Sequence, residues 1–146
     1  MPNTVEEALS QGIPYVGPVR GTSMRPLIRA ERDRVAIAPL GASEPLRLHD
    51  VVLLCMGGHL ILHRVVACEG DRITLLGDGS FIPERDVPRA CIRGRMEGLW
   101  RGGRAVDLSG GAYRAYVRVW TALAPVRCTV LRLRARASHM VKGKRS

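Results

Sequence analysis

Ser23 stands in a stretch whose composition suits a nucleophile, Gly21-Thr22-Ser23-Met24-Arg25-Pro26. Gly21 can adopt backbone geometries that other residues avoid, and Pro26 fixes φ and lacks an N–H group. A turn of this kind can hold a hydroxyl outward among free backbone N–H groups, which is what a nucleophile and its oxyanion site require. An isolated serine in a Gly/Pro turn is usually only a turn residue, so the assignment depends on partners elsewhere in the chain.

Two further residues would complete a serine-hydrolase site. His63 lies in the apolar run 61–66, and Asp78 lies in the turn Gly77-Asp78-Gly79. Taken singly, the first is typical of a packed strand residue and the second of a turn former. Together with Ser23 they supply a hydroxyl, an imidazole and a carboxylate. An imidazole with an ordinary pKa of about 6.5 can accept the serine proton near neutral pH.

The position of the first lysine restricts the general base. Because no lysine precedes Lys142, a Ser–Lys dyad cannot form within the β-rich body. The base for Ser23 must then be a histidine, and the candidates are His49, His59, His63 and His139. His59 shares a strand face with His63 by parity, but neither a third ligand nor a metalloprotease glutamate accompanies the pair. We therefore expect no metal and no other cofactor.

Charge divides the chain into two regions. Residues 1–107 hold 14 Arg and 13 acidic residues, whereas residues 108–146 hold nine Lys/Arg and no acid. We predict a β catalytic domain over 1–107 and a basic helical extension with a tail over 108–146. A chain of 146 residues is long enough to bury a core without disulfides.

The first region has the pattern of an antiparallel β protein. Thr4 and Glu7 form a capping box, which predicts a short helix through about Gln11. Several short apolar or alternating runs follow, and Gly57-Gly58 predicts a tight hairpin turn. This pattern predicts a small coiled antiparallel sheet or partly open barrel. The expected strands are 34–38, 51–55, 59–67, 72–76 and 90–97, with a further hairpin at 101–104.

The second region changes to helical spacing. Aromatic and aliphatic residues recur every three to four positions from Tyr113 to Leu123. Pro125 should kink or end that helix, and 128–137 should form a second helical piece. We expect residues 139–146 to form a disordered basic tail.

Five segments in order resemble the type I signal peptidase superfamily, most closely its histidine-type branch of endoplasmic-reticulum, archaeal and SipW-like enzymes. They lie between about residues 15 and 97: Gly21–Pro26, Asp33–Ile37, Asp50–Val52, Leu62–Val66 and Leu76–Gly79. The resemblance implies a coiled β-sheet fold and a serine endopeptidase that cleaves leader or signal peptides after small residues.

The resemblance also implies roles for individual residues. Ser23 takes the place of the nucleophile and His63 that of the general base. Asp78 matches the aspartate of the family's Gly-Asp-Asn loop, and the carboxylate partner of His63 is expected to be Asp78 or Asp86. The backbone N–H of Ser23 would contribute to the oxyanion site. Met24 and Pro26 would shape the substrate groove.

The sequence departs from the family pattern at several points. Arg32 and His49 stand where the family usually has glycine, and no acid occurs between Asp78 and Glu84. No segment reaches the length of a membrane span, and the N-terminus is polar and acidic, unlike an export signal. We therefore expect a protein that is cytoplasmic or peripheral to the membrane.

Two kinds of partner are expected. One is a peptide or protein precursor as substrate, and the other is a surface that the basic extension contacts. Tyr113, Tyr116, Trp120 and Leu123 beside Arg114, Arg118 and Arg127 would suit an anionic membrane surface or a partner protein. The same helix packed on the β body, with its arginines in water, is the simpler alternative. Nucleic acid is not expected, because no recognised binding motif accompanies the charge.

One alternative function from another class stays open. A catalytically inactive peptide-binding module would keep the fold and the groove but lack a working nucleophile. A self-cleaving regulator is disfavoured, because no DNA-binding segment precedes the β body and no lysine base is present in it.

Overall fold

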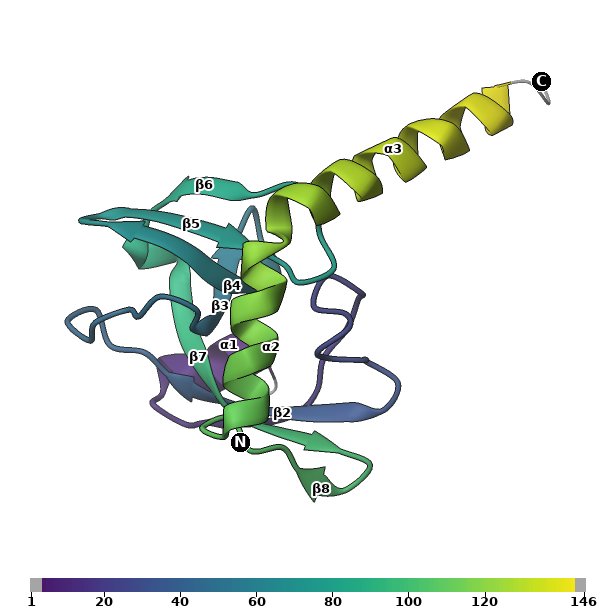
Figure 1. The fold of residues 1–146 in the computed structure, drawn as a ribbon. Helices are drawn as coiled ribbons and strands as arrows, with labels where there is room; N and C mark the ends of the chain where they lie inside the picture. Colours follow the sequence, from purple (N-terminus) through teal and green to yellow (C-terminus); the bar gives the residue numbers. More distant parts are fainter. Residues whose placement is uncertain (1–3, 144–146) are drawn as a thin grey trace.

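One antiparallel sheet organises the chain, and it does not close into a barrel (Figure 1). The computed structural model describes residues 4–143. The prediction of a mainly β protein with a short N-terminal helix and basic C-terminal helices is confirmed. The strands are β1 (Tyr15–Pro18), β2 (Asp33–Pro39), β3 (Val51–Met56), β4 (His59–Glu69), β5 (Arg72–Leu76), β6 (Glu84–Val87), β7 (Ile92–Arg101) and β8 (Arg104–Ala105). The helices are α1 (Val5–Ser10), the 3₁₀ turn η1 (Arg89–Cys91), α2 (Gly111–Ala122) and α3 (Ala124–Gly143).

The strands follow the order β1-β2-β7-β3-β4-β5-β6, and β8 pairs with β7. The expected hairpin joins β3 to β4 through Gly57-Gly58, and His63 lies opposite Val52 within it. The strand expected over 90–97 begins only at Ile92 and runs to Arg101, because η1 occupies the preceding residues. The short strands β1 and β6 were not expected from the sequence pattern.

The core lies on both faces of the sheet around β3. Val51 and Leu53 join one buried cluster, whereas Val52 and Leu54 join the other. Successive side chains of a strand point to opposite faces, so a strand covered on both sides must be apolar at every position. This explains why 51–54 is uninterrupted by polar residues. It also places the neighbouring strand β4 deep enough to bury His63 and Arg64.

The N-terminal helix begins at the predicted cap. The Thr4 hydroxyl accepts a hydrogen bond from the Glu7 N–H at 3.1 Å, and Glu6 and Glu7 lie in the first turn. Both features stabilise the positive end of the helix. The helix ends at Ser10, and Ala8 and Leu9 are buried.

The C-terminal helices meet at Leu123. Helix α2 lies along the β body, whereas α3 leads away from it (Figure 1). Pro125 falls in the first turn of α3, where its missing N–H group costs no helical hydrogen bond. The expected disordered tail is wrong for residues 139–143, which continue α3, and its last part, 144–146, lies outside the described residues. Within residues 4–143, no helix has both the length and the apolar character needed to cross a membrane.

Candidate active site

Ser23 lies half-buried in a turn that follows the extended segment after β1. Gly21 has φ 86°, a left-handed conformation that favours glycine, as the composition of the turn predicted. The Arg25 N–H donates to the Thr22 carbonyl at 3.1 Å, and the Arg25–Pro26 peptide bond is cis. Within the described chain, neither the hydroxyl nor the N–H of Ser23 makes a hydrogen bond. Both groups are therefore unengaged.

The residues after Ser23 fix the turn to the body. Met24 and Leu27 are buried in the core cluster beneath it, and Arg101 donates a 2.6 Å hydrogen bond to the Leu27 carbonyl. Met24 is only 4% exposed, so its side chain packs in the core and does not form a groove wall, contrary to the expectation. Pro26 is exposed and lines a surface pocket of about 610 Å³ together with Tyr113 and Tyr116.

His63 presents one ring nitrogen to this turn. Its side chain is 5% exposed, and Nδ1 is buried without a hydrogen-bond partner. Nε2 lies on the side of Gly77: a Cβ atom added to Gly77 would stand 3.1 Å from it. Burial lowers the pKa of His63 below its ordinary value, and the charges of Glu84 and then Asp78 oppose this effect. The ring is therefore a neutral base near pH 7.

Gly77 is where the Ser23 turn and His63 meet. The same added Cβ would overlap the Ser23 carbonyl oxygen, so only a residue without a side chain lets the three segments come together. Two residues on, the Gly79 N–H donates to that carbonyl oxygen at 2.8 Å. The loop 77–79 thus holds the Ser23 turn beside the imidazole, although Ser23 and His63 make no hydrogen bond to each other.

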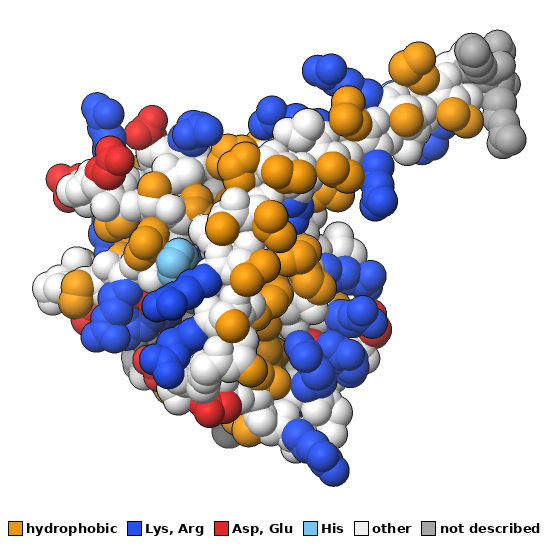
Figure 2. Space-filling model, in the orientation of Figure 1, with side chains coloured by type: hydrophobic (Ala, Val, Ile, Leu, Met, Phe, Trp, Pro, Cys, Tyr) orange, Lys and Arg blue, Asp and Glu red, His pale blue; other side chains and the backbone are white. Residues whose placement is uncertain are grey.

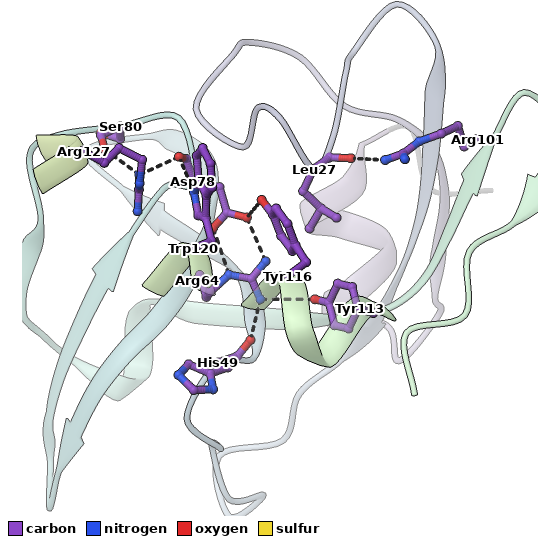
Figure 3. Close-up of polar contacts among 10 residues, drawn as sticks. All are labelled: Leu27, His49, Arg64, Asp78, Ser80, Arg101, Tyr113, Tyr116, Trp120 and Arg127. Atoms are coloured by element: carbon purple, nitrogen blue, oxygen red, sulfur yellow. Dashed lines mark hydrogen bonds and ion pairs between the residues drawn. The ribbon is translucent and has the colours of Figure 1, made fainter. Parts of the chain in front are cut away.

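Asp78 does not hydrogen-bond His63, because its carboxylate is engaged elsewhere (Figure 3). Both oxygens accept 2.9 Å hydrogen bonds from the Arg64 guanidinium, and the Tyr116 hydroxyl donates to Oδ2 at 2.7 Å. Arg64 and Asp78 are each 2% exposed. A buried charge pair of this geometry is structural, since each ion neutralises the other out of reach of water.

The C-terminal helices hold the backbone of the same loop. The Asp78 carbonyl accepts hydrogen bonds from Trp120 Nε1 at 2.9 Å and from Arg127 Nη1 at 2.6 Å. The Arg127 guanidinium also stacks 4.8 Å from the centre of the Trp120 ring. These contacts place α2 and the first turn of α3 against the loop that positions Ser23. Helical spacing predicted the aromatic face of α2, but nothing in the sequence indicated what it would contact.

Arg64 also ties the loop to the turn before β3. Its Nη1 donates to the His49 carbonyl at 3.0 Å and to the Tyr113 hydroxyl at 3.2 Å. His49 has φ 75°, a left-handed conformation that glycine adopts more readily than histidine. Burial acts to lower the pKa of Arg64, but the hydrogen bond and charge of Asp78 outweigh it and raise the pKa overall. Arg64 therefore stays charged.

The second predicted carboxylate, Asp86, is not brought to His63. It lies exposed on β6 with φ 52°, and none of its interactions reaches the imidazole. Glu84, at the start of the same strand, is half-buried opposite Leu75 and is the stronger of the two anionic influences on His63. Glu84 was not among the site residues predicted from the sequence. Its only signal was its position as the first acid after Asp78.

No protein-family model matches the chain, and no curated protein matches it at a significant level. The likeness to signal peptidases therefore depends on the motif residues and their arrangement alone. Within residues 4–143, no three His, Cys, Asp or Glu side chains gather closely enough to hold a metal ion.

Replacing Arg64 by methionine should strongly destabilise the fold. The change leaves the Asp78 carboxylate buried without its cation, and we expect a loss of about 3–5 kcal/mol in the free energy of unfolding. Urea denaturation measures the effect. Arg25→Met removes a partner from the exposed Arg25–Glu31 pair and should cost about 0–1 kcal/mol. Equal losses for the two variants would contradict the structural role of the Arg64–Asp78 pair.

Proposed function

We propose that the protein is a serine endopeptidase that resembles the signal peptidases, with Ser23 as nucleophile and His63 as general base. The observation that carries the proposal is the meeting of the Ser23 turn and His63 Nε2 against Gly77. The unengaged hydroxyl and N–H of Ser23 and the lowered pKa of His63 agree with it. A buried imidazole with one accessible nitrogen is suited to accept a single proton from a neighbouring hydroxyl.

The proposed reaction is acyl transfer through a covalent intermediate. His63 Nε2 takes the Ser23 proton as Oγ forms a bond to the scissile carbonyl carbon, and the Ser23 N–H donates to the resulting oxyanion. The imidazolium then gives its proton to the departing amine as the C–N bond breaks. Water, deprotonated by the same imidazole, then attacks the acyl carbon, and the imidazolium returns its proton to Oγ as the C–Oγ bond breaks.

In this proposal the carboxylates have different roles from those first expected. The Asp78 carboxylate binds Arg64 and thereby holds the loop 77–79, so the role of Asp78 is to position the site. Glu84 supplies the negative charge that favours the imidazolium, without a hydrogen bond to Nδ1. The reacting pair is then a Ser–His dyad in the field of Glu84.

The substrate class follows from the resemblance and from the approach to Ser23. We propose extended precursor peptides with small residues beside the cut. Among the described residues, strand β1 is an edge strand that pairs with β2 alone, and the chain runs from it into the Ser23 turn. An extended peptide can add to such an edge through main-chain hydrogen bonds. We place this activity in the cytoplasm or at the membrane periphery.

A peptide-binding module without catalysis is the second candidate. Two observations favour it: His63 Nδ1 has no hydrogen-bond partner to orient the ring, and Ser23 is not bonded to Nε2. Such a module would bind the same extended peptides and release them uncut.

Ser23→Ala and His63→Ala should each abolish peptide cleavage. Removal of the nucleophile or the base should lower kcat/KM by at least about a thousandfold. Mass spectrometry of a peptide library with Ala-x-Ala sequences, incubated with each variant, measures the loss.

Two control variants separate catalysis from folding. Ser10→Ala and His59→Ala make the same changes at exposed positions, the latter on the same strand as His63, and should retain activity. Cleavage that survives Ser23→Ala would exclude the proposed nucleophile. Peptides that bind tightly to the wild type and are never cut would favour the binding module.

Glu84→Gln should lower the pKa of His63. The negative charge of Glu84 raises this pKa, so its removal should move the titration to lower pH, whereas the exposed Asp86→Asn should leave it unchanged. Proton NMR of the imidazole ring follows the titration without any substrate. The acid limb of kcat/KM, already expected below pH 6.5 because protonation inactivates the base, should move in the same direction. A shift caused by Asp86→Asn but not by Glu84→Gln would refute this assignment.

A further inference from the structure

Helix α3 leaves the β body after its first turn. Arg127 anchors that turn to the Asp78 carbonyl and the Trp120 ring, and the rest of the helix extends away from the sheet (Figure 1). At 1.5 Å per residue, its 20 residues span about 30 Å. Because α3 projects from the body, the side chains that it exposes require an explanation.

The exposed large apolar side chains of α3, together with Ala137, form one stripe. They recur at spacings of four, three, four, three and one residues, which places them on one face about 100° wide. The five larger members are between 43% and 70% exposed. The α3 stripe consists of Val126, Val130, Leu133, Ala137, Met140 and Val141. Figure 2 shows hydrophobic side chains along the length of α3.

Basic residues border the α3 stripe. At 100° per residue, Arg134 and Arg136 fall on opposite edges of it, about 80° to either side of Val126. Arg132 and Lys142 add further positive charge, and no acidic residue follows Asp107. Long arginine side chains at such borders can keep their guanidinium groups in water or among phosphates while the apolar face is buried.

The stripe is a different surface from the one expected on α2. Tyr116 and Trp120 bond to Asp78, and Tyr113 bonds to Arg64, so the aromatic face of α2 is used inside the molecule. Leu123, the fourth apolar residue of the expected surface, is 49% exposed, and Val119 is 57% exposed.

Charge distinguishes between the partners that could cover the α3 stripe. A second copy would bring two helices together with five positive charges each and no acid on either. A nucleic acid would satisfy the arginines but leave the apolar face in water. An anionic lipid surface satisfies both, because its headgroups attract the arginines and its acyl boundary accepts the apolar face.

We propose that α3 is a surface anchor that lies in the plane of an anionic lipid membrane, with the α3 stripe turned into the acyl boundary. Arg134 and Arg136 contact the headgroups on either side. The anchor is independent of the proposed peptidase activity, since it needs neither Ser23 nor His63. Arg127 links the anchor to the loop 77–79, so the site stands close to the surface at which α3 is held.

Vesicle co-sedimentation of the full chain tests the anchor. Vesicles of equal parts phosphatidylglycerol and phosphatidylcholine should bind the protein, and phosphatidylcholine alone should bind it at least about tenfold more weakly. Higher salt should weaken the binding, because it screens the attraction between arginine and headgroup. Arg134→Gln with Arg136→Gln should lower the affinity for the mixed vesicles by about tenfold or more.

Two matched variants separate the stripe from charge alone. Leu133→Glu and Ser138→Glu each add one negative charge to an exposed position of α3, but Ser138 lies outside the stripe. We expect Leu133→Glu to weaken vesicle binding about 30-fold or more and Ser138→Glu about fivefold or less. Circular dichroism checks that both variants keep the wild-type fold.

Several outcomes would overturn the proposal. One is no binding to the mixed vesicles, and another is equal binding to neutral lipid without salt dependence. Equal effects of Leu133→Glu and Ser138→Glu would show that the stripe does not contact lipid. Dimerisation in the absence of lipid, abolished by Leu133→Glu in sedimentation velocity, would identify the stripe as a contact between copies instead.

Discussion

The buried pair of Arg64 and Asp78 constrains the rest of the structure. An ionised carboxylate that is 2% exposed must have its charge balanced and its oxygens bonded, and Arg64 does both. Arg64 comes from the centre of the sheet and Asp78 from the loop after β5, so the pair fixes that loop to β4. The Tyr116 hydroxyl, which comes from α2, donates a further hydrogen bond to the Asp78 carboxylate. Three parts of the chain are thereby locked at one point.

These contacts of Asp78 also determine the position of the Ser23 turn. Gly77 and Gly79 flank Asp78, and each lies against the backbone around Ser23 so closely that a Cβ atom would collide with it. Asp78 itself is bonded through its carboxylate to Arg64 and through its carbonyl to Trp120, so both glycines flank an anchored residue. The arrangement brings the backbone of Ser23 and the His63 imidazole, whose burial lowers its pKa, to the same glycine, Gly77. The proposed acyl transfer would need preorganisation of this kind more than it would need extra groups.

Local patterns in the sequence predicted much of this fold. The structure contains three local features that the sequence predicted. They are a strand over the apolar run 51–55, a hairpin turn at Gly57-Gly58 and a helix start at the Thr4 cap. The glycines around Asp78 indicated a turn, which the structure contains. That Ser23 and His63 form one reacting site stays a prediction from the order of the motifs. These signals depend on neighbours in sequence or on a short pairing distance, which is why they could be interpreted without coordinates.

Contacts between distant segments could not be predicted in this way. Asp78 accepts hydrogen bonds from residues 14, 38 and 42 positions away in the sequence. The spacing of apolar and polar residues does not predict such pairings. Helical spacing therefore left open whether the aromatic face of α2 would meet a membrane, a partner protein or the β body, and in the structure it bonds to Arg64 and Asp78. Glu84 was overlooked for the same reason, since its influence on His63 arises from the pairing of β6 with β5. Residues beyond 107 thus complete a site whose motifs all lie before it.

The C-terminal helices hold the loop 77–79, and through it the Ser23 turn. Amide hydrogen exchange at Gly79, whose N–H donates to the Ser23 carbonyl, measures that bond directly. Gly79 should exchange slowly in the wild type. Trp120→Phe, which removes the indole donor to the Asp78 carbonyl, should speed its exchange by about tenfold, while the amides of the central strand β3 keep their rates. Exchange at Gly79 as fast as in an exposed loop, or a rate that Trp120→Phe leaves unchanged, would contradict the claim.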